Sequence, residues 1–231
     1  MTPANFDHWV RLDSGPGAPA YNMAVDEALL EAAPALGQPV LRFYGWTEPA
    51  ATFGYFQKIS EIERVTRLRP LVRRPTGGGL VPHDADWTYS LAFPPAHAWH
   101  ALRATESYER VHQWLRAAFA RLGVAAELAP CCRKEIPGQC FAGHEKSDLL
   151  WHGRKIAGAA QRRTKTGLLI QGSVQPPPGA DRRDWQQAMG DAAQTDWGAH
   201  WEPWEISGVL AGRVRELVET KYARADYNRR R

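Results

Sequence analysis

The sequence predicts an α+β fold in which a mixed β-sheet is flanked by helices. Segments with strand-like alternation and segments with helical periodicity follow one another along the 231-residue chain. Several predicted strands are joined by short turns, which a doubly wound parallel sheet does not permit. Apolar residues make up 44% and charged residues 23% of the chain, the balance of a globular protein that buries a sizeable core.

The first half of the chain contains four predicted strands and three predicted helices. Met23, Val25 and Leu29 lie on one side of a helix over residues 21–32. Ser60 and Glu63 have the spacing of a capping box, so a short helix should start there and run to about residue 68. The longest helix is predicted over residues 105–122, where apolar residues recur at helical spacing. The predicted strands cover residues 9–12, 40–44, 51–55 and 87–93.

The second half divides at the run Pro176-Pro177-Pro178-Gly179, which breaks the chain and is typical of a linker. We expect residues 1–175 to form the main domain. Residues 176–231 should form a C-terminal helical extension packed on it, ending in a frayed basic tail at 228–231. Before the linker, short strands are predicted over residues 149–151, 155–157 and 168–174.

Composition also bears on compartment and partners. No apolar run reaches the ~18–20 residues of a membrane span, and the N-terminus has no secretion-signal pattern. Three cysteines make no disulfide framework, so a reducing cytoplasm is expected. A net charge of +4 suits either nucleic acid or an acidic protein. The ten tryptophans are scattered rather than interleaved with basic residues, which favours packing over base stacking.

A glycine triplet, Gly77-Gly78-Gly79, is the first candidate site. Consecutive glycines let the backbone approach a ligand closely, although they can equally form a simple turn. The pattern is neither a P-loop nor a dinucleotide-binding fingerprint. Arg74 precedes the triplet and His83 follows it, which suits a pocket for a polar or anionic group.

Cys140 and Lys155 are the second candidate site. A free cysteine is most often a small buried hydrophobe, and zinc ligation with Cys131, Cys132 and His144 fits no common spacing. Nearby basic residues would instead favour a nucleophilic thiolate at Cys140. Lys155, taken alone, resembles a surface lysine on a hairpin. The small residues of 157–160 that follow it would leave room for an acyl chain.

Four motifs, in the right order over residues 8–175, resemble the lipoate ligase and octanoyltransferase family of the biotin/lipoate protein ligase superfamily. They are the helix at 21–30, the arginine–glycine loop at 73–84 with Thr88-Tyr89-Ser90, the lysine motif at 153–162 and the strand at 171–174. Each is weak alone, but the ordered set is specific.

The details resemble the branch that takes octanoyl from acyl carrier protein. ATP-using ligases usually carry Gly-Asn before the Tyr-Ser, whereas this chain has Asp86-Trp87-Thr88 before Tyr89-Ser90 and so resembles the Thr-Tyr-Ser form of that branch. Cys140-Phe141 precedes Lys155 by about fifteen residues, as in that branch. The chain departs from the pattern after Phe141, at Gly79, where the branch often has Arg, and at Gln171, where it usually has His. These departures concern the identity of the acyl donor.

The resemblance implies a biotin/lipoyl ligase-like catalytic acyl-transfer domain and an octanoyltransferase of lipoate biosynthesis that works through a thioester on Cys140. Octanoyl would pass from acyl carrier protein to a lysine of a lipoyl domain of 2-oxoacid dehydrogenases or of the glycine cleavage H protein. No metal, cofactor, nucleic acid or membrane is expected. The alternatives are an ATP- and magnesium-dependent lipoate–protein ligase and a non-catalytic basic binding protein. The implied catalytic residues are Cys140 and Lys155, and the implied substrate-binding residues are Arg74, Gly77, Gly78, Gly79, His83, Ala157 and Gly158.

Overall fold

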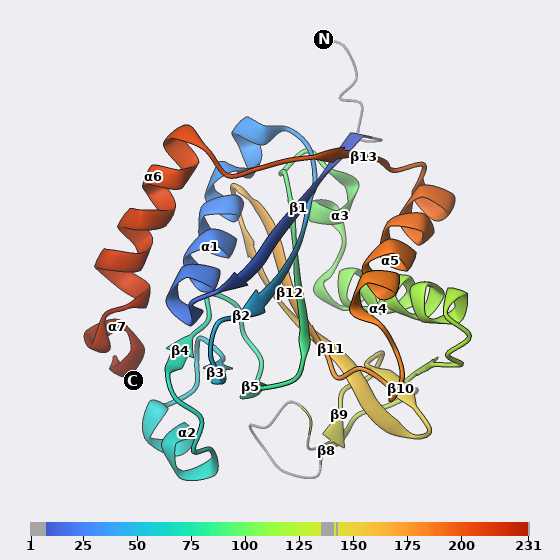
Figure 1. The fold of residues 1–231 in the computed structure, drawn as a ribbon, viewed down its shortest axis with the longest axis horizontal. Helices are drawn as coiled ribbons and strands as arrows, with labels where there is room; N and C mark the ends of the chain where they lie inside the picture. Colours follow the sequence, from blue (N-terminus) through green and yellow to red (C-terminus); the bar gives the residue numbers. More distant parts are fainter. Residues whose placement is uncertain (1–7, 135–140, 142, 231) are drawn as a thin grey trace.

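A computed structural model describes residues 8–134, 141 and 143–230. Within that part, eight strands form one main sheet in the order β13–β1–β2–β6–β12–β11–β10–β7 (Figure 1). β13, β1 and β2 run parallel, and each of the other neighbouring pairs is antiparallel. The predicted mixed sheet is therefore confirmed. Its strands are β1 (His8–Gly17), β2 (Val40–Trp46), β6 (Trp87–Phe93), β7 (Glu127–Leu128), β10 (Leu149–Trp151), β11 (Arg154–Thr164), β12 (Gly167–Val174) and β13 (His200–Pro203).

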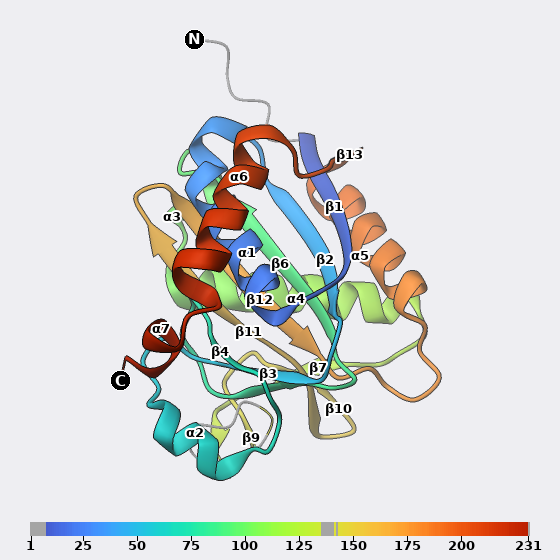
Figure 2. The same cartoon turned by 60° about the vertical axis from the view of Figure 1, so that its left-hand side comes forward.

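Helices lie on both sides of this sheet (Figures 1 and 2). α1 (Pro19–Leu36) and α6 (Gly208–Leu217) pack together on one side, and α4 (Ala104–Arg121) and α5 (Arg182–Trp197) pack together on the other. Shorter helical segments connect or extend these layers. They are α2 (Ile59–Val65), α3 (Ala98–Ala101), the π-helix η1 (Val218–Tyr222) and α7 (Ala225–Arg229). No helix in the described ranges has the length and apolar character that crossing a membrane requires.

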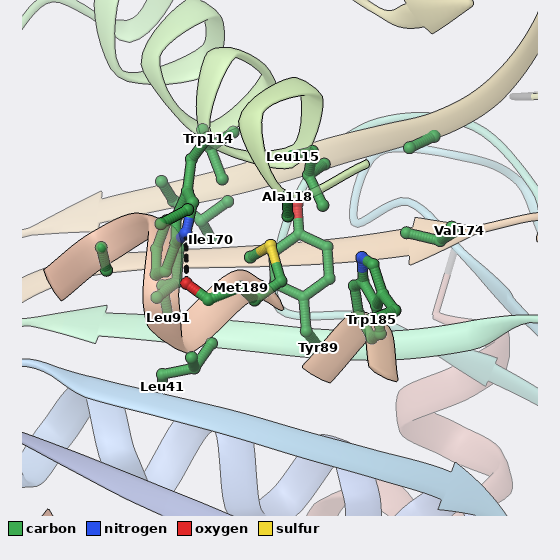
Figure 3. Close-up of a cluster of buried hydrophobic side chains, with 14 of the residues drawn as sticks. Leu41, Tyr89, Leu91, Trp114, Leu115, Ala118, Ile170, Val174, Trp185 and Met189 are labelled. Carbon is green, nitrogen blue, oxygen red and sulfur yellow. Dashed lines mark hydrogen bonds between the residues drawn. The ribbon is translucent and has the colours of Figure 1, made fainter. Parts of the chain in front are cut away.

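The main hydrophobic core lies between the sheet and α4 and α5. Alternate residues of β6 point into it, among them Tyr89 and Leu91, which meet Trp185 and Met189 of α5 (Figure 3). Trp114 of α4 donates its indole N–H to the Met189 carbonyl at 2.7 Å, so this large side chain is buried without losing its hydrogen bond. Each fully buried large apolar side chain contributes about 1.5–3 kcal/mol, so this layer anchors the sheet.

The opposite face of the sheet packs on α1 and is partly polar. Ala92 of β6 and Val40 of β2 pack in an apolar cluster with α1 residues such as Val25. Further along the same face, buried Ser90 and Thr88 replace apolar residues on β6. A buried polar strip at this position must satisfy its hydrogen bonds internally, and it forms part of the candidate site described below.

A small sheet in the order β4–β3–β5 closes this polar end. β3 (Ala50–Phe53) pairs in parallel with β4 (Leu71–Arg73) and antiparallel with β5 (Val81–His83). The arginine–glycine loop therefore connects two strands that flank β3. A separate short pair, β8 (Arg133–Lys134) and β9 (Gly143–His144), lies on either side of the segment that contains Phe141.

The structure differs from the sequence prediction at three places. The capping box at Ser60 is wrong, because α2 starts one residue earlier, at Ile59, and its N-cap is Lys58. Residues 176–231 are not wholly helical, since β13 pairs with β1 at the edge of the main sheet. The tail is not frayed at Asn228, which is buried and accepts the backbone N–H of Arg73 at 2.8 Å.

Candidate active site

A cavity lies between α1, the main sheet and the small sheet, and it contains about 460 Å³ of space not filled by protein atoms, its open end included. We call it the inner cavity. Its wall is largely aromatic, aliphatic and small, with a few polar groups, which is the character of a site for an apolar ligand that carries one polar end. Its lining residues are Met23, Tyr44, Trp46, Thr52, Arg74, Val81, His83, Thr88, Phe141, Lys155, Gly158, Ala159, Ala160, Gln171, Gly172 and Ser173.

Lys155 contributes a buried charge to this wall. Its Nζ lies 2.7 Å from Asp148 Oδ2, and the two side chains are 7% and 0% exposed. Lys155 Nζ also lies 5.3 Å from the ring centroid of Phe141. A buried ammonium is stable only when it is paired and hydrogen-bonded, so Asp148 is what allows a cation at this point of an apolar wall.

Asp148 is held in turn by two neighbours. The Tyr108 hydroxyl of α4 donates to Asp148 Oδ1, and the Glu145 backbone N–H donates to Oδ2 at 2.6 Å. With Lys155 these donors occupy both carboxylate oxygens. The carboxylate is therefore fixed from the helix layer, and it fixes the lysine at the edge of the cavity.

A β-bulge explains how Lys155 reaches the cavity. Leu149 pairs with Ala157 and Leu150 pairs with Lys155, so Ile156 is an extra residue on β11. In a regular strand, residues two apart point to the same face. Lys155 would then point the same way as Ala157, whose methyl group lies in the core. The bulge breaks the alternation and places Lys155 on the cavity side.

Gly158 provides the space that the lysine occupies. A Cβ at this position would lie 2.6 Å from Lys155 Cε, 2.7 Å from its Nζ and 3.2 Å from Asp148 Oδ1. Real Cβ atoms do not stand so close to other heavy atoms, so a side chain here would force the end of the Lys155 side chain to shift. The glycine of the lysine motif therefore makes room for the Lys155–Asp148 pair as well as for a ligand.

Arg74 links the glycine loop to the cavity. Its Nη2 donates to the carbonyl oxygens of Gly77 and Gly79 at 2.8 and 2.7 Å, and its Nη1 donates to Thr52 Oγ1 at 2.9 Å. The guanidinium is thus a clamp for the loop as well as part of the wall. Gly78, at φ 81°, lies against Gly54, where a Cβ would stand 1.9 Å from the Gly78 oxygen.

His83 and Asp86 form a buried pair in the same wall. His83 Nδ1 is 2.9 Å from Asp86 Oδ2, and His83 Nε2 is 2.8 Å from Thr52 Oγ1. The tautomer with its hydrogen on Nδ1 donates to Asp86 and accepts from the Thr52 hydroxyl. Trp46 stacks on the ring at 3.8 Å between centroids. With both nitrogens engaged and one face covered, His83 holds the wall in shape.

Asp26 organises the buried end of the cavity. Its carboxylate accepts from Arg42 Nη1 at 2.7 Å, from Ser90 Oγ at 2.6 Å and from Gln171 Nε2 at 2.7 Å. The Tyr44 hydroxyl donates to it at 3.0 Å, and burial, followed by the Asp26 charge, raises the pKa of Tyr44 well above its usual value. The aspartate is thus fully paired, and a fixed polar network supports the cavity from below.

The structure places the predicted site residues in different roles. Lys155, Arg74, His83 and Gly158 line the inner cavity. The three glycines of the triplet are not part of its lining, and two of them present carbonyl oxygens to Arg74. Ala157 does not line the cavity because its side chain is buried in the main core. Cys140 lies outside the described residues, while its sequence neighbour Phe141 is in the wall.

Sequence reasoning missed the residues that support this wall, above all Asp148, Asp86 and Asp26. Each is a single carboxylate outside the lysine motif and the glycine triplet. One sequence signal could have indicated them. An aspartate beside a predicted buried strand or within an apolar helix face must find a partner, because an unpaired buried charge is costly. Cys131 and Cys132 are exposed, and the described residues contain no group of three or more potential metal ligands.

Comparison with known proteins places the chain. The family model described as the lipoyl protein ligase A/B catalytic domain matches residues 18–175. The chain belongs to this family. Octanoyltransferase LipM of Bacillus subtilis is 31% identical over 277 aligned residues, which cover 96% of this chain and 98% of that protein. Octanoyltransferase LipM of Halalkalibacterium halodurans is 38% identical over 179 residues, 72% of this chain but only 65% of that protein.

Solved structures of lipoate–protein ligases share the fold. A lipoate-protein ligase A bound with ATP aligns with a TM-score of 0.78 at 20% identity, covering 96% of this chain and 98% of that one. The bi-partite lipoate protein ligase of Thermoplasma acidophilum aligns with a TM-score of 0.73 at 19% identity, covering 96% and 95%. The predicted family and fold are therefore confirmed.

Proposed function

We propose that this protein is an octanoyltransferase that moves octanoyl from acyl carrier protein to a lysine of a lipoyl domain or of the glycine cleavage H protein. Two relatives are named Octanoyltransferase LipM, one aligned over 98% of its length at 31% identity and one over 65% of its length at 38% identity. These names support octanoyl as the acyl group and acyl transfer as the reaction class. One structural neighbour, a bi-partite lipoate protein ligase, is described together with its E2 lipoyl domain, which supports a lipoyl-domain acceptor.

The observation that carries the proposal is the position of Lys155 and Phe141 together at the edge of an apolar cavity. Phe141 follows Cys140 in the chain. A cavity with few polar groups suits an eight-carbon chain, and an ammonium at its edge suits the polar carboxyl end of that chain. A cation near a thiol also favours the thiolate.

In the proposed reaction the Cys140 thiolate attacks the thioester carbonyl of the donor. The bond from carbonyl carbon to the carrier's sulfur breaks, the carrier thiol leaves with a proton, and octanoyl is held as a thioester on Cys140. A neutral acceptor lysine amine then attacks the same carbon, the bond from that carbon to the Cys140 sulfur breaks as the amide forms, and the proton that the amine loses passes to the Cys140 sulfur. Backbone N–H groups near Gly158 would stabilise the oxyanion of each step. Because the donor is already a thioester, no metal, cofactor or ATP takes part.

The ligase alternative rests on one specific observation, namely that a structural neighbour was solved with ATP in the same fold. Two incubations with an apo lipoyl domain separate the reactions. One contains octanoyl-loaded carrier protein without nucleotide, and the other contains free octanoate with ATP and magnesium. We expect octanoylation, read by intact mass, in the first mixture alone. Modification in the second mixture alone would identify a ligase, and modification in neither would favour the binding protein.

Variants at the two candidate catalytic residues sharpen the test. Cys140→Ala should abolish both the covalent acyl-enzyme and transfer, whereas Cys131→Ala and Cys132→Ala should keep both. Lys155→Arg retains charge but presents a larger planar group that cannot take the position of the ammonium beside Asp148, so it should fail nearly as completely as Lys155→Ala. Normal transfer by Cys140→Ala would overturn the nucleophile assignment.

A further inference from the structure

A second, wider space adjoins the inner cavity, and we call it the outer groove. It contains about 1120 Å³ not filled by protein atoms, its open side included. Phe141 and Lys155 line both spaces, so the two meet at these residues. The inner cavity ends among buried side chains such as Met23 and Tyr44, each 1% exposed. A ligand that fills the inner cavity can therefore extend into the outer groove past Phe141 and Lys155.

The two spaces differ in chemistry. The side chains that set the character of the outer groove are Asp84, His144, Arg154 and Gln175, all polar. Arg154 is exposed at the start of β11, and in the described part of the chain no carboxylate is paired with it. Gln175 Nε2 is buried without a hydrogen-bond partner among the described atoms. Donors that are not satisfied within the protein suit a ligand rich in acceptors.

We propose that the outer groove binds the phosphopantetheine arm of the donor thioester, with Arg154 on its phosphate and His144 beside the arm. This inference rests on the proposed octanoyl transfer. The arm carries one phosphate, one hydroxyl and two amides. Gln175 Nε2 donates to an amide carbonyl, and Asp84, the acidic residue of the described wall, accepts from an N–H or O–H of the arm.

The junction of the two spaces supports this occupant over others. A thioester carbonyl has two substituents, an apolar acyl chain on one side and a polar pantetheine arm on the other. An apolar cavity and a polar groove that meet at Lys155 match these two substituents, and they place the reacting carbon at the shared wall. Guanidinium groups bind phosphate through paired N–H donors, which suits Arg154 to the charged end.

The phosphate could also be that of a nucleotide, so the experiment compares the two sources. Transfer to an apo lipoyl domain is measured from octanoyl-4′-phosphopantetheine and from octanoyl-pantetheine, which lacks the phosphate. We expect kcat/KM to be about 10-fold higher for the phosphorylated donor. Arg154→Gln should reduce this ratio to about 1 by lowering the phosphorylated donor alone. Arg116→Gln, an exposed arginine of α4, is the matched control and should keep the ratio.

Binding is measured separately from turnover with the octanoyl-amide analogues of both donors, which cannot transfer. Calorimetry should show tighter binding of the phosphorylated analogue to the wild type and equal binding of both to Arg154→Gln. Equal binding of the two analogues to the wild type would overturn the inference, as would an unchanged preference in Arg154→Gln. Loss of ATP binding in Arg154→Gln without any preference for the phosphorylated analogue would assign the groove to a nucleotide instead. Absence of transfer from both thioesters would refute the proposed function without touching the binding result.

Discussion

Lys155 Nζ lies 2.7 Å from Asp148 Oδ2, and both side chains are almost fully buried. The pair connects the lysine motif of β11 to Tyr108 of α4, which donates to the other oxygen of Asp148. The position of the candidate catalytic ammonium therefore depends on a carboxylate and a helix that lie outside the motif. This dependence can be measured.

Asp148→Asn keeps the shape of the side chain and removes its charge. The Lys155 ammonium is then buried without a counter-charge, a situation that costs about 3–5 kcal/mol. We expect octanoyl transfer to fall at least about 10-fold, because the ammonium is no longer held at the cavity edge by its partner. The exposed Asp196→Asn is the control. Transfer by Asp148→Asn at the rate of the wild type would show that Asp148 does not position the ammonium.

Gly158→Ala tests the space beside the lysine. The added methyl group would overlap Lys155 Cε and Nζ at 2.6 and 2.7 Å, so the ammonium must move away from the cavity edge. We expect transfer to fall about as far as in Lys155→Ala, while the sheet stays folded by circular dichroism. Gly212→Ala meets no neighbouring atom within 4 Å in α6 and should be stable and fully active. Full activity of Gly158→Ala would refute this arrangement.

Met23→Ala tests the buried end of the inner cavity. Met23 lines the cavity on α1, where its sulfur is 3.4 Å from Gln171 Nε2. Shortening it lengthens the apolar space, so the preference for decanoyl over octanoyl donors should rise about 10-fold. Met189→Ala removes an equally buried methionine of the main core and should lose stability, by about 2–5 kcal/mol, without a change in chain preference. If Met23→Ala and Met189→Ala showed the same preference between decanoyl and octanoyl donors, the end of the acyl chain would not lie at Met23.

Two buried histidines predict acid sensitivity of the fold. Burial lowers the pKa of His112 and of His97 from 6.5 to about 4, and for His97 the charge of Arg110 adds to this. Between pH 6.5 and pH 4 the unfolded chain binds a proton at each histidine, whereas the folded protein does not. The contribution of each buried histidine to the free energy of unfolding is therefore complete above pH 6.5 and is lost as the pH falls toward 4. Each site contributes up to about 2 kcal/mol between pH 7 and pH 5.

Urea unfolding at pH 7, 6 and 5 checks this, and His112→Leu is the test variant. Its free energy of unfolding should fall with pH about half as steeply over this range as that of the wild type, since His97 remains. His152→Asn replaces an exposed histidine and should keep the full slope. A pH dependence that survives unchanged in His112→Leu would contradict the assignment.

Sequence patterns predicted most of the elements and the family, but only part of the site. The strand over residues 87–93 and the strand over 149–151 match β6 and β10, because apolar periodicity and turn residues define such segments locally. β13 was missed because its residues are largely exposed and it is a strand only through pairing with β1, nearly two hundred residues earlier. Asp148 and Asp86 were missed although their partners Lys155 and His83 are close in sequence, because apolar periodicity does not show that a single carboxylate will be buried.

The bulge at Ile156 has a consequence for protein design. A site of this kind cannot be transplanted by copying its side chains onto a regular strand, since a regular strand would aim the amine into the apolar core with Ala157. The site needs the additional residue Ile156 as much as it needs Lys155, because the bulge directs the lysine to the cavity side. A designer who keeps the β11 sequence but pairs it with β10 as a regular ladder would preserve every functional group in the sequence and lose the site.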